Sequence, residues 1–258
     1  MDYPNISALL PTFNCEKTIR GTLQSIQWAD EIVVVDSYSS DNTLNICREF
    51  GARIIQHEYI NSAKQKNWAA KQCLHSWVLQ IDSDEILEEG LETEIRQAVV
   101  NAAEQVHCYQ IPRKNFFAGV WLRYGGNYPD YQRRLFRRDE GHWMDREVHA
   151  HIEVSGQIQS LRGHIIHNDW PYLAKPLNNL NRYTRYEADE LYKLHKHFHW
   201  IDLVIRPWVV FWYIYIVKRA YRDSWRGYIF SVYMAMYVFL TRAKLWELDE
   251  LELEKSPK

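Results

Sequence analysis

Apolar runs alternate with amphipathic stretches along the first 112 residues. The runs "ISALLPTFN" and "EIVVVDSYSSDNT" are apolar or β-branched and stop at polar turn residues, which is typical of strands buried in a parallel sheet. "ARIIQHE" and "SWVLQIDSD" predict two more strands, and "CEKTIRGTLQSIQ" and "NTLNICREFG" carry apolar residues at helical spacing. This alternation predicts an α/β layer fold with right-handed connections and a ligand site at the carboxyl ends of the strands.

The rest of the chain changes character twice. Residues 113–170 are rich in Arg, Tyr, Trp and His and are punctuated by Gly, which predicts short strands and loops around a polar site. Residues 171–258 predict helices and become strongly aromatic after Trp200. We therefore expect three parts, with boundaries near residues 112 and 170.

Three polar clusters fall where predicted strands end: "PTFNCE" at 11–16, "VDSYSSDNT" at 35–43 and "IDSDE" at 81–85. The carboxyl ends of parallel strands share one edge, so these clusters should converge on one crevice. Asp36, which ends the second strand, is placed to accept hydrogen bonds from a nucleotide base or ribose. The chain has no G-x-G-x-x-G after the first strand and no G-x-x-x-x-G-K-[ST], so a dinucleotide site or a P-loop has no support.

The acids of "IDSDE" have two interpretations. Asp82 and Asp84 are two residues apart and would leave a strand on the same side, where carboxylates can hold a hard divalent cation together with phosphates. Asp-Ser-Asp-Glu before an apolar helical pattern is also a good helix cap, and taken alone the cap is the more ordinary explanation. A cap is equally open for Ser40 or Asp41, because a helix is predicted to begin near Thr43.

The order of the motifs carries a resemblance. "LLPTFNCEKTIRGTLQSI", "DEIVVVDSYSSDNT", "AKQKNWA" and "WVLQIDSDEIL" resemble the nucleotide-binding half of family 2 glycosyltransferases, which have the GT-A fold, a Rossmann-like mixed α/β sheet with flanking helices. "YPDYQRRLFRR", "VHAHIEVSG", "GHIIHNDW" and "LNRYTRYEA" resemble the subgroup of lipopolysaccharide core heptose β-1,4-glucosyltransferases. The likeness covers nearly the whole chain. It implies an inverting transfer of a hexose, glucose from UDP-glucose, to a membrane-associated glycan acceptor, with Mg²⁺ or Mn²⁺ as cofactor.

The resemblance also implies roles for single residues. The nucleotide pocket would be lined by Pro11, Thr12, Asn14 and Glu16, with Asp36 and Ser37 on the base and ribose and Lys66 near the phosphates. Asp82 would face the ribose and metal-bound water, and Asp84 would bind the metal directly, which leaves Glu85 for the helix start. Arg134 would hold the donor diphosphate or a phosphorylated acceptor, since guanidinium suits bidentate phosphate contacts.

The expected catalytic base is missing from its usual place. The related subgroup has His-Glu in a "VHE" stretch, whereas the matching run here is "DREVHAHIEV", with His149 in register and Ala150 in place of the Glu. Three readings stay open: a nearby carboxylate, Glu147 or Asp145, serves as base; His149 or His151 takes the proton; or activity is lost. We favour the nearby carboxylate because the donor motifs are intact.

The carboxyl-terminal part is both basic and aromatic. Residues 203–246 contain seven Lys or Arg, one acid and thirteen aromatic residues. The uncharged runs Pro207–Val217 and Gly227–Thr241 are shorter than the roughly 20 residues that span a bilayer. Aromatic helices edged by Lys and Arg fit the headgroup region of an anionic leaflet. We expect a peripheral position on the inner face of the cytoplasmic membrane, the alternative being a helical hairpin packed on the catalytic domain or on a second subunit of a homo-oligomer.

Charge and cysteine content bear on the partners and the compartment of the protein. The net charge of −2 and the lack of an RNA-binding signature argue against a nucleic-acid partner. Four cysteines without a C-x-x-C pair, and an amino terminus without an apolar leader, favour a reduced, cytoplasmic protein. Two other functions stay open: a catalytically silent donor-binding protein of a membrane glycan assembly, suggested by Ala150, and a nucleotidyltransferase, disfavoured because "PTFNCEKT" is not a Gly-rich basic loop.

Overall fold

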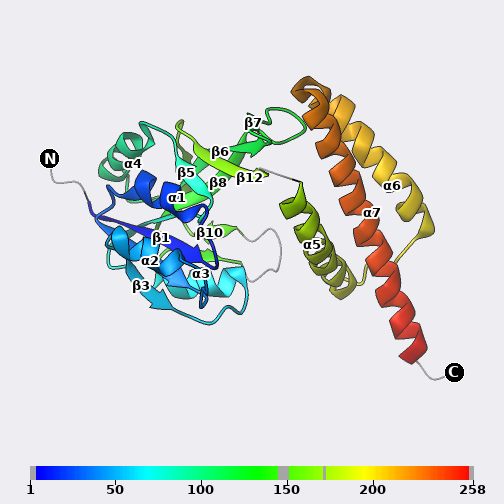
Figure 1. The fold of residues 1–258 in the computed structure, drawn as a ribbon, viewed down its shortest axis with the longest axis horizontal. Helices are drawn as coiled ribbons and strands as arrows, with labels where there is room; N and C mark the ends of the chain where they lie inside the picture. Colours follow the sequence, from blue (N-terminus) through cyan, green and yellow to red (C-terminus); the bar gives the residue numbers. More distant parts are fainter. Residues whose placement is uncertain (1–3, 145–150, 171–172, 256–258) are drawn as a thin grey trace. The chain divides into compact units, whose positions relative to one another are not determined.

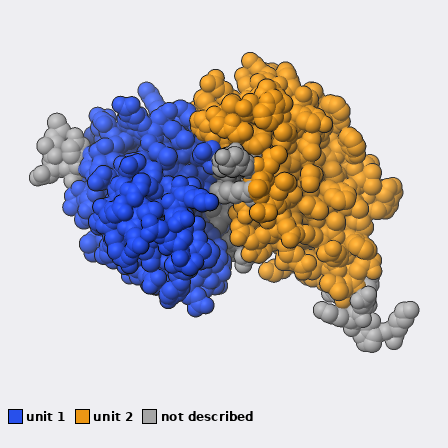
Figure 2. Space-filling model, in the orientation of Figure 1, with its two compact units in different colours: residues 1–114, 130–168 blue, residues 115–129, 169–258 orange. Residues whose placement is uncertain are grey.

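The computed structural model describes residues 4–144, 151–170 and 173–255 (Figure 1). The chain forms two compact units (Figure 2), of which unit 1 holds residues 1–114 and 130–168 and unit 2 holds residues 115–129 and 169–258. The three parts expected from the sequence differ in expected function, whereas these two units are defined by compactness, so the three-part division stays a prediction.

One half of the sheet in unit 1 is parallel, as the apolar runs predict. Its strands follow the order β3-β2-β1-β4. The elements of this half are β1 (Ile6–Thr12), α1 (Ile19–Ile26), β2 (Glu31–Asp36), α2 (Thr43–Glu49), β3 (Arg53–Gln56), α3 (Ser62–Ala70) and β4 (Trp77–Gln80). Leu10 and Val34 face one hydrophobic core while their neighbours Leu9 and Val33 face the other. Both faces of these strands are therefore buried, which explains why they read as continuous apolar runs.

The other half of the sheet is largely antiparallel. The strand order continues from β4 through β8 and β6 to β12 and β5, with β8 antiparallel to both of its neighbours. The elements are β5 (Glu85–Leu87), α4 (Leu91–Val100), β6 (Val106–Phe117), β7 (Val120–Trp121), β8 (Asp130–Arg137), β9 (Gly141–Trp143), β10 (Ile152–Val154), β11 (Gln157–Ser160) and β12 (Ile165–Trp170). The result is a mixed sheet with flanking helices, which confirms the predicted fold class.

The prediction of a helix directly after "IDSDE" is wrong. Residues Glu85–Leu87 form the short strand β5, which pairs antiparallel with β12, and α4 begins only at Leu91. Gly90, in the left-handed conformation at φ 87°, precedes that helix. Glu85 and Leu87 are buried and Ile86 is exposed, a strand alternation that the carboxylates obscure in the sequence. Glu85 therefore does not start a helix, and the acids of this motif are not a helix cap.

The same observation corrects the geometry expected for Asp82 and Asp84. Strand β4 ends at Gln80, so both acids lie in the turn that joins β4 to β5. Their proximity comes from this turn and its neighbours, not from the two-residue repeat of a strand.

Unit 2 is mostly helical, as expected for the carboxyl-terminal part. Helix α7 packs against both α5 and α6. The helical elements are α5 (Ala174–Lys193), α6 (Trp200–Trp212), a π-helical turn η1 (Tyr213–Val217), a 3-10 turn η2 (Ala220–Asp223) and α7 (Ser224–Lys255). The short strand β7, together with the last residues of β6, also belongs to this unit.

Helix α6 continues into η1 as one helical segment, Trp200–Val217. By length and composition alone this segment is long and apolar enough to cross a membrane, and 6% of it is buried. The uncharged runs of the sequence did not predict such a segment, because Arg206 limits the run to eleven residues. In the structure the Arg206 Nε lies 2.6 Å from Asp202 Oδ1, one helical turn away, so the two charges form a pair.

Candidate active site

The loops that follow β1 and β2 are bonded to each other at the carboxyl edge of the sheet. The Asn14 side-chain oxygen accepts a hydrogen bond from the Ser40 N–H at 2.8 Å, and the Asn14 N–H donates to Ser39 Oγ at 2.9 Å. Two residues further along each loop, Glu16 accepts from the Asn42 N–H at 3.0 Å. The expected convergence of these two motifs is confirmed. Asn14 and Glu16 are exposed.

Asp36, the last residue of β2, is fully buried. Its carboxylate accepts hydrogen bonds from the Thr12 hydroxyl at 3.0 Å and from the Ser39 N–H at 2.8 Å. Ser37, next in the chain, is partly exposed and accepts from Gln65 Nε2 of α3 at 2.7 Å. The geometry therefore shows Asp36 holding the two loops together, while Ser37 lies nearer to solvent.

Backbone strain marks the same two loops. Asn14 and Tyr38 adopt positive φ angles of 46° and 60°, which side chains other than Gly rarely take. Strained backbone of this kind is concentrated at ligand sites, where surrounding contacts hold it in place. Each loop also exposes a large aromatic residue, Phe13 at 61% and Tyr38 at 60%. Phe13 and Tyr38 both stand inside the motifs at the strand ends, and only their exposure in the structure marks them.

Asp82 is held by two cations and an amide from three different elements. Lys66 Nζ of α3 lies 2.9 Å from Asp82 Oδ1, and Arg134 Nη2 of β8 lies 2.7 Å from Asp82 Oδ2. Gln80 Nε2 also donates to Asp82 Oδ1 at 2.8 Å. Desolvation disfavours the charged form, but Arg134 and Lys66 outweigh it and hold the pKa of the Asp82 carboxyl well below its usual range. Asp82 is therefore ionised at neutral pH.

Arg134 is buried, and its terminal nitrogens are occupied by groups of the protein. Nη2 contacts Asp82 and lies 2.6 Å from Glu85 Oε1, and Nη1 donates to Gln80 Oε1. Burial works against its charge, but Asp82 and Glu85 raise the pKa of Arg134. The guanidinium is thus a fixed positive charge behind Asp82.

Glu85 links this network to Arg113 of β6. It is fully buried, and its Oε1 also lies 2.9 Å from Arg113 Nη1. Arg113 in turn pairs with Asp130 at 2.8 Å, while Glu85 Oε2 accepts from the Asp82 backbone N–H at 3.1 Å. Glu85 therefore holds in place both the turn that carries Asp82 and Arg134, the cation that stabilises the ionised form of Asp82. The sequence alone does not reveal these roles of Glu85 and Arg113, because a helix cap accounts for Glu85 and no motif marks Arg113.

Asp84 has an imidazole beside it that the sequence analysis did not select. His167 Nε2 of β12 lies 3.7 Å from Asp84 Oδ1, and both side chains are partly buried. The pairing of β12 with β5, in which His167 stands opposite Glu85, brings the two together. A carboxylate and an imidazole are suitable ligands for Mn²⁺, and the charged Asp82 lies two residues away. The described residues hold no group of three or more His, Cys, Asp or Glu side chains that could bind a metal, so Asp84 and His167 are two candidate ligands for a divalent cation.

The candidates for the catalytic base lie outside the described residues. Asp145, Glu147 and His149, with Ala150, belong to the segment 145–150. The described residues that flank it are tied down: the Met144 N–H donates to the His151 carbonyl at 3.3 Å. Asn67 of α3 exchanges two hydrogen bonds with the backbone of Trp143, each of 2.8 Å. Trp143 therefore lies against the helix that carries Lys66.

Comparison with known proteins gives the family. The family model described as glycosyl transferase family 2 matches residues 7–153. The chain belongs to this family. It is thus a glycosyltransferase.

Two relatives match over almost the whole length. The lipopolysaccharide core biosynthesis glycosyltransferase LpsC of Rhizobium meliloti is 26% identical, over 96% of this chain and 94% of its own. An uncharacterised glycosyltransferase of Rickettsia typhi is also 26% identical, over 95% of this chain and 87% of its own. The similarity to LpsC agrees with the subgroup that the motifs resemble.

A solved structure shares the fold. The mannosyltransferase PcManGT of Pyrobaculum calidifontis, solved with GDP-Man and Mn²⁺, superposes with a TM-score of 0.58 over 96% of this chain and 88% of its own. At 14% identity this likeness concerns the fold alone. It confirms the GT-A architecture for this chain.

Proposed function

We propose that this glycosyltransferase is an inverting, metal-dependent hexosyltransferase that moves glucose from UDP-glucose to a membrane-associated glycan. The acceptor would be a lipopolysaccharide core or a polyprenyl-linked saccharide. The observation that carries the proposal is an ionised Asp82, in contact with Lys66 and Arg134, two residues along the chain from the contact between Asp84 and His167. The name of the relative LpsC supports the lipopolysaccharide core as acceptor class.

Asp84 and His167 are assigned to the metal. They would hold Mg²⁺ or Mn²⁺ with the donor diphosphate, and Asp82 would contact the metal-bound water and the ribose. Both Asp82 oxygens already accept hydrogen bonds, which suits an outer position better than direct ligation. When bound, such an ion stabilises the charge of the departing nucleoside diphosphate.

Arg134 and Lys66 are assigned different tasks. Arg134 is buried and bonded to Asp82, Gln80 and Glu85. We therefore propose that Arg134 positions Asp82 and keeps its carboxylate ionised. Its expected contact with a phosphate stays a prediction that these bonds do not favour. Lys66 Nζ donates to Asp82 Oδ1 and is partly exposed, which leaves further donor hydrogens for a phosphate.

The donor pocket is assigned to the cross-bonded loops. Pro11, Asn14, Glu16 and Ser37 are the exposed or partly exposed members and would contact the nucleotide. Thr12 and Asp36 are buried and bonded to each other, so they would support these loops from below. This differs from the direct base contact predicted for Asp36 and remains to be tested.

The chemical step needs a base on the acceptor side. A carboxylate would take the proton of the acceptor hydroxyl as its oxygen attacks the anomeric carbon, and the nucleoside diphosphate would leave with the electrons of the broken bond. Glu147 and Asp145 are the proposed carboxylates, with His149 as the alternative. A membrane-bound acceptor would place the enzyme on the inner face of the cytoplasmic membrane.

The decisive experiment supplies purified protein with UDP-glucose and other nucleotide sugars, with and without Mn²⁺, and with membrane extract as acceptor. We expect UDP release that depends on both metal and acceptor. Glu147→Gln or Asp145→Asn should lower the rate at least about 100-fold with donor binding unchanged, in line with the loss of a general base. Glu153→Gln, an exposed acid on the nearby β10, is the matched control and should keep full activity.

Other results would point elsewhere. Donor binding without turnover on any acceptor would favour a silent donor-binding protein. Full activity in both carboxylate variants, with loss in His149→Ala, would move the base to the histidine. Pyrophosphate release from a nucleoside triphosphate would reveal a nucleotidyltransferase.

A further inference from the structure

The turn between α6 and α7 in unit 2 concentrates positive charge. Lys218, Arg219 and Arg222 are exposed there, and Arg226 follows on the first turns of α7. Within residues 213–230 the one acid is Asp223. The turn therefore carries four bases against one acid.

The Asp223 carboxylate is bonded to the backbone of the loop after β7, which also belongs to unit 2. Its carboxylate accepts hydrogen bonds from the N–H of Arg123 at 3.1 Å and of Tyr124 at 2.8 Å. The Gly125 N–H donates to the Lys218 carbonyl at 2.9 Å. Gly125 has a φ of 72°, and a Cβ at this position would lie 3.2 Å from the Ala220 Cβ, so a side chain would be both strained and crowded. The loop after β7 is thus fastened to the α6–α7 turn.

Aromatic rings accompany the basic side chains on this joint surface. The Arg123 guanidinium lies 4.5 Å from the centre of the Trp121 ring, and that of Arg222 lies 4.5 Å from the Tyr124 ring. Such contacts orient the cations without cancelling their charge. We call residues 121–125 and 218–226 the basic tip.

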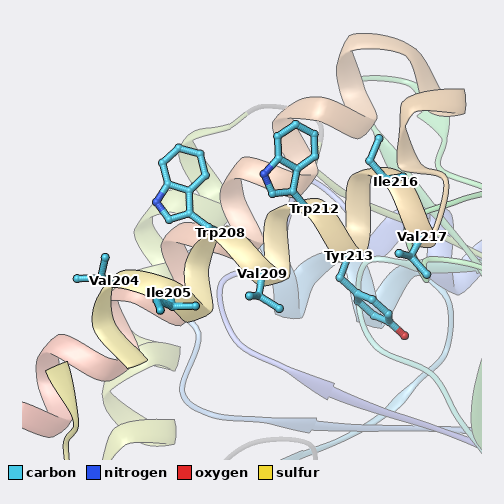
Figure 3. A pocket seen from close by; sticks show the side chains of 8 residues that line it. All are labelled: Val204, Ile205, Trp208, Val209, Trp212, Tyr213, Ile216 and Val217. Atoms are coloured by element: carbon cyan, nitrogen blue, oxygen red, sulfur yellow. The ribbon is translucent and has the colours of Figure 1, made fainter. Parts of the chain in front are cut away.

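The exposed face of α6 continues from the basic tip and is apolar. Figure 3 shows the eight side chains that line a groove of about 620 Å³ on this one helical segment. The members of this apolar face are Val204, Ile205, Trp208, Val209, Trp212, Tyr213, Ile216 and Val217. They follow two rows at a spacing of four residues, so they share one side of the helix. Trp208 is 65% exposed and Val217 is 64% exposed, although a helix of this kind normally buries its apolar side.

We propose that the basic tip and the apolar face form one docking surface for a bilayer of anionic phospholipid. Charge complementarity selects this occupant, because Lys218, Arg219 and Arg222 would meet lipid phosphates. The tryptophans of α6 would sit at the boundary between headgroups and acyl chains. This inference rests on the proposed function, which requires an acceptor in the membrane, but binding itself needs no transfer reaction.

Helix α6 lies on the surface of the bilayer in this arrangement and does not cross it. The opposite side of α6 packs against α7, and Asp202 and Arg206 occupy its first turns. A crossing helix would carry this ion pair toward the hydrocarbon, which is costly. The fastening of the loop 121–125 to the tip also means that the membrane surface includes the chain that links β6 to β8.

Co-sedimentation of the full chain with vesicles tests the proposal. We use neutral phosphatidylcholine vesicles and vesicles with added phosphatidylglycerol, each at low and high salt. The wild type should prefer the anionic vesicles, and salt should weaken the binding. The triple change Lys218→Gln, Arg219→Gln and Arg222→Gln should lower partitioning about 100-fold, from about fivefold for each basic residue.

A matched triple change controls for net charge. Arg182→Gln, Lys193→Gln and Lys196→Gln remove three exposed bases of unit 2 that lie outside the tip. This variant should bind like the wild type. Equal losses in the two triple variants would overturn the proposal, because they would show attraction by net charge without a defined surface.

The apolar face has its own test. Trp208→Ser with Trp212→Ser should weaken binding to anionic vesicles at least about tenfold, because apolar burial adds to the electrostatic attraction. Unchanged binding in this variant would overturn the role of α6. Protein that resists extraction of membranes with alkaline carbonate would show a crossing helix, and a concentration-dependent dimer abolished by the tryptophan changes would show a second copy on this face. Either result overturns the proposal.

Donor binding separates this inference from the proposed function. UDP-glucose binding, measured by calorimetry, should be the same in the tip variants and the wild type, and circular dichroism should show the same helical content. Vesicle binding by a protein that binds no nucleotide sugar would leave the docking surface in place and refute the proposed function. Donor binding without vesicle binding would refute the docking surface alone.

Discussion

His167 Nε2 lies 3.7 Å from Asp84 Oδ1, across the pairing of β12 with β5. This contact joins Asp84, the second aspartate of the "IDSDE" motif, to a histidine of β12, the last strand along the described chain. Because both groups can ligate a divalent cation, His167→Ala and Asp84→Asn should each weaken Mn²⁺ binding by at least about tenfold. Titration of Mn²⁺ by electron paramagnetic resonance measures this directly.

An exposed histidine provides the control for the metal prediction. His142 is on β9, and its contact is with Glu153 at 3.6 Å. His142→Ala should bind Mn²⁺ like the wild type. If His167→Ala also keeps wild-type affinity while Asp84→Asn loses it, the imidazole only orients the carboxylate and is not a ligand.

Arg134 should matter for stability as well as for activity. Arg134→Met removes the cation that faces Asp82 and Glu85, and Glu85 is fully buried. Loss of one partner of a buried ion pair leaves an uncompensated charge, so we expect the free energy of unfolding to fall by about 3–5 kcal/mol. Urea unfolding followed by circular dichroism measures the change.

A surface arginine gives the comparison for that change. Arg20 pairs with Glu49 at 2.7 Å, and both side chains are about half exposed. Arg20→Met should cost no more than about 1 kcal/mol, because exposed ion pairs contribute little. Similar losses in the two variants would show that the network around Asp82 has no special energetic role.

Acid should destabilise the protein through Asp82. Its pKa is held below the usual range in the folded state, so as pH falls below about 4 the unfolded chain takes up the proton first. The stabilisation from ionised Asp82 is therefore present above that pH and is lost as pH falls further. Between pH 4 and 2.5, the unfolding free energy of the wild type should fall more steeply than that of Asp82→Asn, by at most about 1.4 kcal/mol per pH unit.

A series of urea unfolding curves across this pH range provides the measurement. Asp189→Asn, which removes a partly exposed partner of Arg185, is the control and should keep the slope of the wild type. Parallel curves for the wild type and Asp82→Asn would mean that the cations around Asp82 do not stabilise its charge.

The parallel half of the fold could be predicted from the sequence, because its strands and helices are marked by local patterns. Leu9 and Leu10, or Val33 and Val34, point to opposite cores, and such doubly buried strands stand out as apolar runs. The convergence of Asn14 with Ser40 also followed, since it requires only that the strands be parallel.

The antiparallel half depends on pairings between distant residues, and there the sequence was less informative. Glu85 resembles a helix cap until its contacts with Arg113 and Arg134 are known. His167 becomes a candidate ligand only through the pairing of β12 with β5. Such pairings depend on register across the sheet, which single-sequence patterns do not determine.

The reactivity of Cys15 should report on donor binding. All four cysteines are free, and burial raises the pKa of every one of these thiols, to about 12 for Cys47, Cys73 and Cys108; Cys15 differs in being partly exposed, whereas the other three are buried. The Cys15 N–H donates to Thr43 Oγ1 at 2.8 Å within the donor loops. One thiol of the folded protein should therefore react with a chromogenic disulfide reagent, and UDP with Mn²⁺ should slow that reaction severalfold. Cys15→Ser should abolish the reaction and Cys108→Ser should leave it intact, whereas a rate unaffected by UDP would place the donor away from these loops.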